Sequence, residues 1–282
     1  MPVNEYHERN RRGWDAVSDG WQAGIERRGV WRQCHRDPRL VFADQEIRWL
    51  QNVPGQRVAV LGSGDNLAVF ALAGMGARVT SVDISQAQLN TAERRAHELE
   101  LDIDLVRADV TDLGALATGS FDLVYTGGHV ALWVSDLPLY YREAARILKP
   151  GGLLVINEYH PFRRIWASQM DRLERESSYL ERGPFEYDRA AELIIRHDRE
   201  GCAARSDDGS GVGVTTDGAS DPAPVGLPSY EFHWTIADYV SALMGSGCTL
   251  LCLDEFGDEP EGWEEAPLTG LPRCLLLVGR KE

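Results

Sequence analysis

Short runs dominated by apolar residues alternate with helical patterns through the middle of the chain. In the runs, apolar residues follow one another instead of alternating with polar ones, which is typical of buried parallel strands because helices cover both faces of such a sheet. These predicted strands are residues 58–61, 78–82, 103–106, 121–125 and 152–158. Helical patterns lie between them, at residues 67–73, 86–99 and 137–148. This order predicts an α/β fold with a parallel sheet and right-handed crossovers.

The flanking segments have other patterns. Residues 6–50 are helical in character and predict a cap over the sheet edge or the site. Residues 163–182 predict a charged helix, residues 185–198 a strand-like run, and residues 206–228, rich in Gly, Ser, Asp and Pro, a mobile loop. A helix at 236–244 and strands at 248–256 and 274–280 follow. We therefore expect four parts: a cap (1–50), a cofactor-binding core (51–162), a lid-like insertion (163–229) and a segment completing the core (230–282).

Composition narrows the classes of partner. The 282 residues include 29 Lys and Arg against 44 Asp and Glu, a net charge of −15, which disfavours nucleic acid and anionic membranes as partners. The five cysteines show no paired or zinc-ligand spacing, so no metal site is predicted and a reducing compartment is favoured. No signal-peptide core or membrane-length apolar run is visible. We expect a cytoplasmic protein, monomeric or homodimeric.

Polar or small residues follow three successive strands. Gly62 and Gly64 come after the first strand, Asp83 nineteen positions after Gly64 closes the second, and Asp109 follows the third. Glycines there let a ligand approach the backbone at a helix start, and a carboxylate at a strand end can bind ribose hydroxyls. A carboxylate like that of Asp109 can accept from the amine of adenine. Together they predict a nucleoside cofactor.

Each of these residues also has a purely structural interpretation. The glycines would form an ordinary tight turn, Asp83 would be a helix N-cap, and Asp109 would cap a turn. For the N-cap, Ser85 is the better candidate than Asp83. Leu67 stands where the third glycine of a dinucleotide-binding G-x-G-x-x-G turn would be, which disfavours a nicotinamide enzyme.

The segments GSG, VDIS, ADVTDL, FDLVYTGG and LKPGGLLVINEYHPF together resemble the class I S-adenosylmethionine-dependent methyltransferases, over about residues 51–162 and the end of the chain after residue 230. The resemblance implies a Rossmann-like, doubly wound seven-stranded sheet with the last strand antiparallel, and S-adenosyl-L-methionine bound at the carboxyl ends of the strands. It also implies cofactor-binding roles for residues at the strand ends and in the cap: Trp14, Trp21, Gly62, Ser63, Gly64, Asp83, Ile84, Asp109, Val110, Thr126 and Gly127.

Two positions depart from the family pattern. Val60 stands where an acid is frequent, and Asn66 replaces the usual third glycine. Asp65 or Asn66 are candidates to take over the task of the absent acid at the methionine end.

Methyl transfer needs an acid or base only when the acceptor loses a proton. Candidates follow the fourth strand (His129 and Trp133) and the fifth (Glu158, Tyr159 and His160), and His233 comes from the SYEFHW segment. A lone histidine is more often structural, but His129 and His160 follow strand ends, where the methyl group would be delivered. Glu158 is a candidate for positioning an amine. Arg163 and Arg164 form either a carboxylate-binding pair or a solvated helix face.

The sequence thus predicts a methyltransferase for a small-molecule acceptor, with O- and N-methylation both open. Two alternatives remain: a non-catalytic S-adenosylmethionine-binding regulator, to which the missing acid at Val60 gives room, and a nicotinamide-dependent oxidoreductase.

Overall fold

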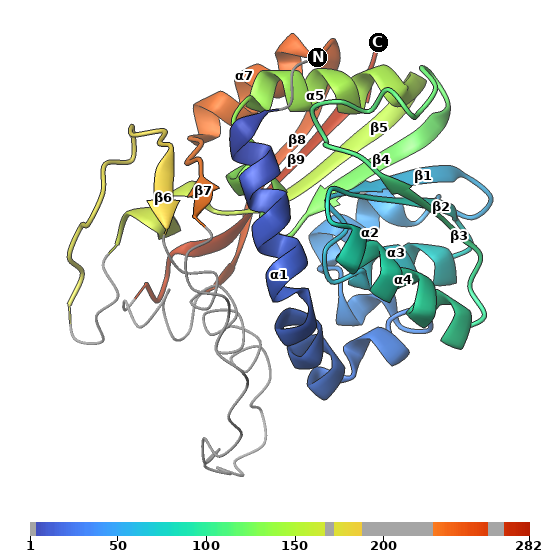
Figure 1. Ribbon diagram of the computed structural model, residues 1–282. Coiled ribbons are helices and arrows are strands. Elements are labelled where there is room, and N and C mark those ends of the chain that lie inside the picture. Colours follow the sequence, from blue (N-terminus) through green and yellow to red (C-terminus); the bar gives the residue numbers. More distant parts are fainter. Residues whose placement is uncertain (1–3, 167–171, 188–227, 259–267) are drawn as a thin grey trace.

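A seven-stranded sheet forms the centre of the computed structural model, which describes residues 4–166, 172–187, 228–258 and 268–282 (Figure 1). The strand order is β3-β2-β1-β4-β5-β9-β8, and β9 runs antiparallel to both of its neighbours. The strands are β1 (Arg57–Leu61), β2 (Arg78–Asp83), β3 (Ile103–Arg107), β4 (Phe121–Gly127), β5 (Leu148–Tyr159), β8 (Cys248–Asp258) and β9 (Pro272–Lys281). The predicted fold class, a Rossmann-like sheet of seven strands with the last antiparallel, is confirmed.

Helices cover both faces of the sheet. On one face α5 and α7 bury Ala59 and Leu61 of β1, and on the other α2 and α3 bury Val58 and Val60. Successive residues of β1 therefore enter two different apolar layers, which is why its sequence shows no alternation. The helices are α1 (Glu5–Arg28), α2 (Asp44–Leu50), α3 (Leu67–Gly74), α4 (Gln86–Glu98), α5 (Leu137–Ile147) and α7 (Ile236–Gly245), with short 3-10 helices η1 (Val30–Arg32), η2 (Pro38–Leu40), η3 (Val130–Trp133) and η4 (Pro161–Ile165).

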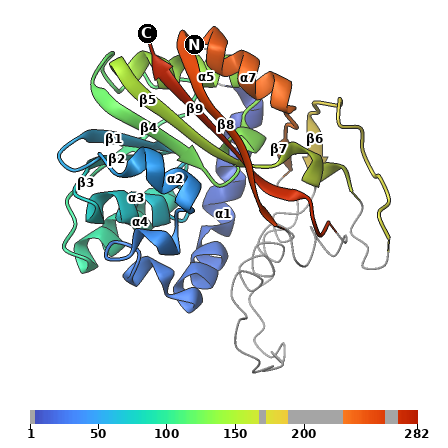
Figure 2. The same cartoon turned by 180° about the vertical axis from the view of Figure 1, so that it is seen from behind.

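Helix α1 connects two parts of the molecule. It lies between α4 and a small antiparallel pair of strands, β6 (Phe185–Tyr187) and β7 (Ser229–Glu231), in both views (Figures 1 and 2). Side chains of α1 contact α4 at one end and β7 at the other. Residues 6–50, predicted to form a cap, contain this long helix followed by η1, η2 and α2.

The charged helix predicted for residues 163–182 is wrong over its described part. Pro161–Ile165 forms a 3-10 turn, and residues 172–182 contain no helix. The backbone N–H groups of Glu176 and Ser177 donate to the carbonyl of Ile165 instead of to a preceding helical turn. Strand β6 covers the first three residues of the strand-like run, and the rest of that run and the loop predicted to be mobile, up to residue 227, lie outside the described residues.

Candidate functional site: a cofactor edge and an acceptor pocket

Glycines shape the turn between β1 and α3. Gly62 and Gly64 have positive φ angles of 63° and 40°, a conformation that glycine adopts without a steric cost. A Cβ atom on Gly62 would lie 2.6 Å from the side chain of Val130, so the turn packs closely against η3, which follows β4. Asn66 ends the turn, also left-handed at φ 65°, and its Nδ2 donates to the Gly64 carbonyl over 2.9 Å.

Asp83 ties two turns together at the end of β2. One carboxylate oxygen accepts from the backbone N–H of Gly64 and the other from that of Ser85, both at 2.8 Å. Burial raises the pKa of Asp83. The N-cap of α4 is Ser85, whose hydroxyl accepts from the Gln88 N–H. Because each carboxylate oxygen offers a second acceptor direction, Asp83 can still receive hydroxyl groups.

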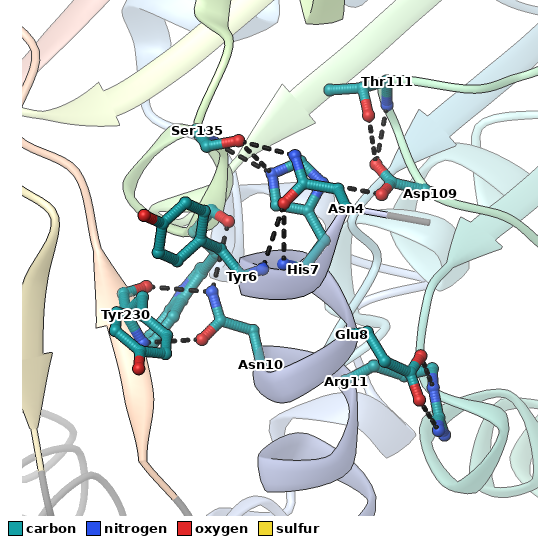
Figure 3. Close-up of polar contacts among 11 residues, drawn as sticks. Asn4, Tyr6, His7, Glu8, Asn10, Arg11, Asp109, Thr111, Ser135 and Tyr230 are labelled. Atoms are coloured by element: carbon teal, nitrogen blue, oxygen red, sulfur yellow. Dashed lines mark hydrogen bonds and ion pairs between the residues drawn. The ribbon is translucent and has the colours of Figure 1, made fainter. Parts of the chain in front are cut away.

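Asp109 is held by residues from two directions (Figure 3). Its Oδ1 accepts from the backbone N–H and the hydroxyl of Thr111, and its Oδ2 lies 2.6 Å from Nδ1 of His7. Nε2 of His7 accepts from the backbone N–H of Ser135 at 2.9 Å. Burial acts to raise the pKa of Asp109, but the hydrogen bonds from His7 and Thr111 outweigh it and the pKa lies below its usual value.

The middle of α1 presents aromatic rings to the same edge. Trp14 makes edge-to-face contacts with Trp21 and with Trp133 of η3, at centroid distances of 5.6 and 5.3 Å. Asp15, next to Trp14, accepts from the hydroxyl of Ser85 at 2.6 Å. We call the turns after β1, β2 and β3, together with these α1 residues, the cofactor edge.

A pocket lies beside the ends of β4 and β5. Residues that line it include His129, Glu158, Tyr159, Arg164, Phe232 and Trp234. We call it the acceptor pocket. Glu158 is 2% exposed, and its carboxylate accepts from the backbone N–H groups of Ala131 (3.1 Å) and His129. Burial raises its pKa to about 7. Carboxylates with such a pKa can exchange protons near neutral pH.

Arg164 joins opposite walls of the acceptor pocket. Its guanidinium lies 3.1 Å from Glu231 of β7 and 3.4 Å from Nδ1 of His129. His233 also lies 3.6 Å from Glu231, and its ring stacks on Phe185 of β6. The segment directly after β7, residues 232–234, therefore lines one wall, and Arg164 is part of the pocket instead of a solvated helix face.

His160 lies elsewhere. Its Nε2 is 2.5 Å from Glu255 of β8, its backbone N–H donates to Arg273 of β9, and it is not among the residues that line the pocket. Burial lowers its pKa, although Glu255 acts in the opposite direction. The two histidines favoured from the sequence are thus separated, and only His129 adjoins Glu158.

Neither a metal centre nor a membrane span is found in the described part of the chain. There, no group of at least three His, Cys, Asp or Glu residues could hold a metal ion. No helix in that part is both long and apolar enough to cross a bilayer.

Sequence comparisons agree with this geometry. A family model described as a methyltransferase domain matches residues 60–156. A ubiquinone biosynthesis O-methyltransferase from Xanthomonas oryzae pv. oryzae is 31% identical over 176 residues, covering 62% of this chain and 68% of that protein. The chain belongs to the class I S-adenosylmethionine-dependent methyltransferases. The methyltransferase is also 26% identical to the uncharacterized methyltransferase YbaJ of Bacillus subtilis, over 60% of this chain and 69% of that protein.

Solved structures share the methyltransferase's fold. An S-adenosylmethionine-dependent methyltransferase from Mesorhizobium loti superimposes with a TM-score of 0.57 at 23% identity, over 84% of this chain and 96% of that one. The [4+2]-cyclase SpnF superimposes with a TM-score of 0.59 at 16% identity, over 100% and 98%. At these identities the likeness concerns the fold alone.

The residues of the cofactor edge fit S-adenosyl-L-methionine, the cofactor of this methyltransferase. Gly62 and Gly64 place no side chain between the turn's backbone and a ligand, and Asp83 keeps acceptor capacity. Asn66 is fully buried, and among the described residues its Oδ1 has no hydrogen-bond partner, so an acceptor remains for a ligand's donor.

The other cofactor candidates lie at or near this edge. Ser63 accepts from the hydroxyl of Ser81, and the Thr126 hydroxyl lies 2.5 Å from that of Tyr140 and so faces α5. Val110 packs into the core under α5, while Ile84 directly follows β2. His7 carried no local sequence signal, because its contact with Asp109 spans 102 positions.

Proposed function

We propose that this methyltransferase methylates a small-molecule acceptor bound in the acceptor pocket, at an atom whose proton passes to Glu158. The observation that carries the proposal is the buried Glu158 carboxylate, which adjoins the pocket and has a pKa of about 7. Its backbone donors, Ala131 and His129, fix its position from one side. A base in a fixed position, with a pKa close to the working pH, suits proton transfer.

The proposal places the two halves of the cofactor on different turns. Asp83 would hold the ribose hydroxyls and Asp109 the adenine amine, with His7 fixing the Asp109 carboxylate. Gly62, Gly64 and Gly127 would lie under the methionine part. When bound, S-adenosylmethionine supplies a methyl group on a sulfonium, which is already activated for displacement.

The protein's own task is then to orient the acceptor and to remove its proton. The rings of Tyr159, Phe232 and Trp234 line the pocket and favour an apolar or aromatic body, and Glu158 takes the proton of its hydroxyl or amine. Arg164 is committed to Glu231 and His129, so the walls are fixed before the acceptor enters. The name of the Xanthomonas relative, an O-methyltransferase, supports a hydroxyl as the methylated group.

Label transfer from methyl-labelled S-adenosylmethionine to a panel of small phenols, alcohols and amines tests the proposal. For an acceptor found in this way, we expect Glu158→Gln to lower kcat by about 10²–10⁴-fold, the usual contribution of a general base. The affinity for S-adenosylhomocysteine should stay the same. Glu255→Gln, which removes the negative charge beside His160, is the matched control and should keep most activity.

Two outcomes would count against the proposal. Cofactor binding without transfer to any member of the panel would favour the non-catalytic regulator. Full activity of Glu158→Gln would show that the acceptor needs no base or uses another one.

A further inference from the structure

A buried acid lies on the sheet face to which Val60 points. Val60 of β1 pairs in register with Tyr125 of β4, so the two side chains lie on the same face, under α2. The Tyr125 hydroxyl donates to Oε1 of Glu46, a residue of α2, over 2.8 Å. The chain therefore has a buried carboxylate on the sheet face where its family frequently has an acid, but brings it from a different element.

The hydrogen-bond partners of Glu46 are neutral groups. Its Oε2 accepts from the backbone N–H of Ala43 at 3.0 Å, and the side chain of Asn157 also bonds to it. Glu46 is 1% exposed, and no Lys, Arg or His of the described chain forms an ion pair with it. Burial raises its pKa. A nearby positive charge from a ligand would stabilise the ionised form of this carboxylate.

The network reaches the carboxyl end of β4. A Cβ atom placed on Gly127 would lie 2.5 Å from the Tyr125 hydroxyl oxygen, so this hydroxyl occupies the space beside Gly127. Asn157 of β5 pairs in register with Gly127. Gly127 thus covers the Glu46–Tyr125–Asn157 network, at the sheet edge next to the glycine turn. Ligands of such sheets bind where the strand order reverses, here between β1 and β4.

We propose that the Tyr125 hydroxyl oxygen binds the amino group of the cofactor's methionine part, and that Glu46 is the positioning residue that makes this oxygen an acceptor. Because the hydroxyl hydrogen is directed to Glu46, the lone pairs of the oxygen are left for an ammonium donor. The Oδ1 atom of Asn66, buried in the adjacent turn, offers a second acceptor. The proposal rests on the cofactor placement given under "Proposed function".

Two ligands that differ by one group test this assignment: S-adenosylhomocysteine and its analogue with hydrogen in place of the amino group. By isothermal titration calorimetry, the wild type should bind S-adenosylhomocysteine about 10- to 100-fold more tightly than the analogue, the range for a hydrogen bond to a charged group. Glu46→Gln keeps an acceptor for Tyr125 but removes the charge. Tyr125→Phe should lose most of the preference, with little change for the analogue, whereas Glu46→Gln, which still accepts from Tyr125, should lose only the part that comes from the charge.

Tyr141→Phe is the matched control. Tyr141 is buried on the opposite face, in the core under α5, and its removal should leave both affinities unchanged. If Glu46 had a purely structural role, its replacement would lower the affinities for both ligands equally, and that result would overturn the assignment. Variants that keep the full preference for S-adenosylhomocysteine would also overturn it. A wild-type chain that binds neither ligand would instead refute the proposed function, and this inference with it.

Discussion

The cofactor edge and the acceptor pocket lie at one edge of the same sheet, but the chain builds them from contacts of different range. At the cofactor edge, Asp83 bonds to Ser85 and Asp109 to Thr111, two positions away in each case. In the acceptor pocket, Arg164 pairs with Glu231, 67 positions later in the sequence. The turns of the cofactor edge are therefore formed by local bonds and joined to α1 by distant ones, such as His7–Asp109, whereas the acceptor pocket depends throughout on how separate segments pack.

This difference explains which part of the function the family determines. Turns at strand ends come with the fold, so the cofactor follows from family membership. The β6–β7 pair beside the pocket is not part of the seven-stranded sheet, and additions of this kind are where proteins of one fold differ in what they bind. The [4+2]-cyclase with the same fold at 16% identity shows that the fold does not determine the reaction.

Removing the Asp83 carboxylate should give the largest loss of ligand affinity among these variants, and the loss should concern cofactor binding alone. Asp83→Ala deletes the acceptor of two backbone N–H groups together with the proposed ribose ligand. We expect affinity for S-adenosylhomocysteine to fall by more than about 100-fold, since hydrogen bonds to a charged group contribute roughly 1.5–3 kcal/mol each. Thermal-shift titration with S-adenosylhomocysteine measures this loss of affinity, and Asp104→Ala, at an exposed position, is the control. An unchanged shift would mean that Asp83 is not the ribose ligand.

Glu158→Gln, which is expected to lower activity, should raise the free energy of unfolding. The pKa of Glu158 is raised from 4.5 to about 7, so its contribution to stability is complete below about pH 4.5 and is lost as the pH rises through 7. The penalty at pH 8.5 is about 3 kcal/mol. The variant, which never ionises, should unfold in urea with a free energy higher than that of the wild type by up to this amount at pH 8.5, and by little at pH 4.5.

No pH trend would show that Glu158 ionises in the folded protein as readily as in water, and the opposite trend that it ionises more readily. Asp83 and Glu46 also have raised pKa values, but they are present in both proteins. Their contributions therefore cancel in the difference between variant and wild type.

Sequence reasoning was most successful where the contacts are local. Apolar runs gave the strands of the sheet, and Ser85 was correctly predicted as the N-cap of α4. The helix predicted over residues 163–182 was wrong in its described part, where one of the charges, Arg164, pairs with the distant Glu231. The Glu46–Tyr125 bond spans 79 positions and leaves no periodic signal.

The catalytic and binding roles of the site residues stay predictions, although the structure shows which of these residues lie together. Glu158 and His129, proposed from their place after strand ends, meet in one pocket, whereas His160 pairs with Glu255. Spacing along the chain places a residue at a strand end. It does not say to which side of the sheet the side chain then turns, since that depends on the packing of β8 and β9 against β5.

Asn10→Ala should affect the acceptor pocket more than the cofactor edge. The Asn10 side chain donates to the Tyr230 carbonyl at 2.9 Å and accepts from its N–H at 2.7 Å, which fixes β7 to α1 (Figure 3). Its loss leaves two buried backbone groups unpaired, at a cost of about 1–3 kcal/mol each. The neighbouring Glu231 should lose its fixed position.

We therefore expect the KM for the acceptor to rise by about tenfold, and the Kd for S-adenosylhomocysteine by less than about threefold, if roughly half of that cost appears in acceptor binding. Steady-state kinetics and calorimetry measure the two values. Asn52→Ala, at an exposed position, is the control. Equal losses in both would show that α1 couples the two regions instead of supporting them separately.

Trp14→Leu should give the smallest change in affinity, and this change should distinguish S-adenosylmethionine from S-adenosylhomocysteine. Trp14 packs edge-to-face on Trp21 and Trp133, and an aromatic face near a sulfonium attracts its positive charge. S-adenosylmethionine carries that charge and S-adenosylhomocysteine does not, so only the first should lose this attraction. At roughly 0.5–1 kcal/mol for an incompletely buried ring, the ratio of the two affinities should fall about two- to fivefold. Calorimetry with both ligands measures the ratio, and Trp49→Leu on α2 serves as the control. If both affinities fall together, Trp14 contributes packing alone, and the charge of the sulfonium is stabilised by other groups.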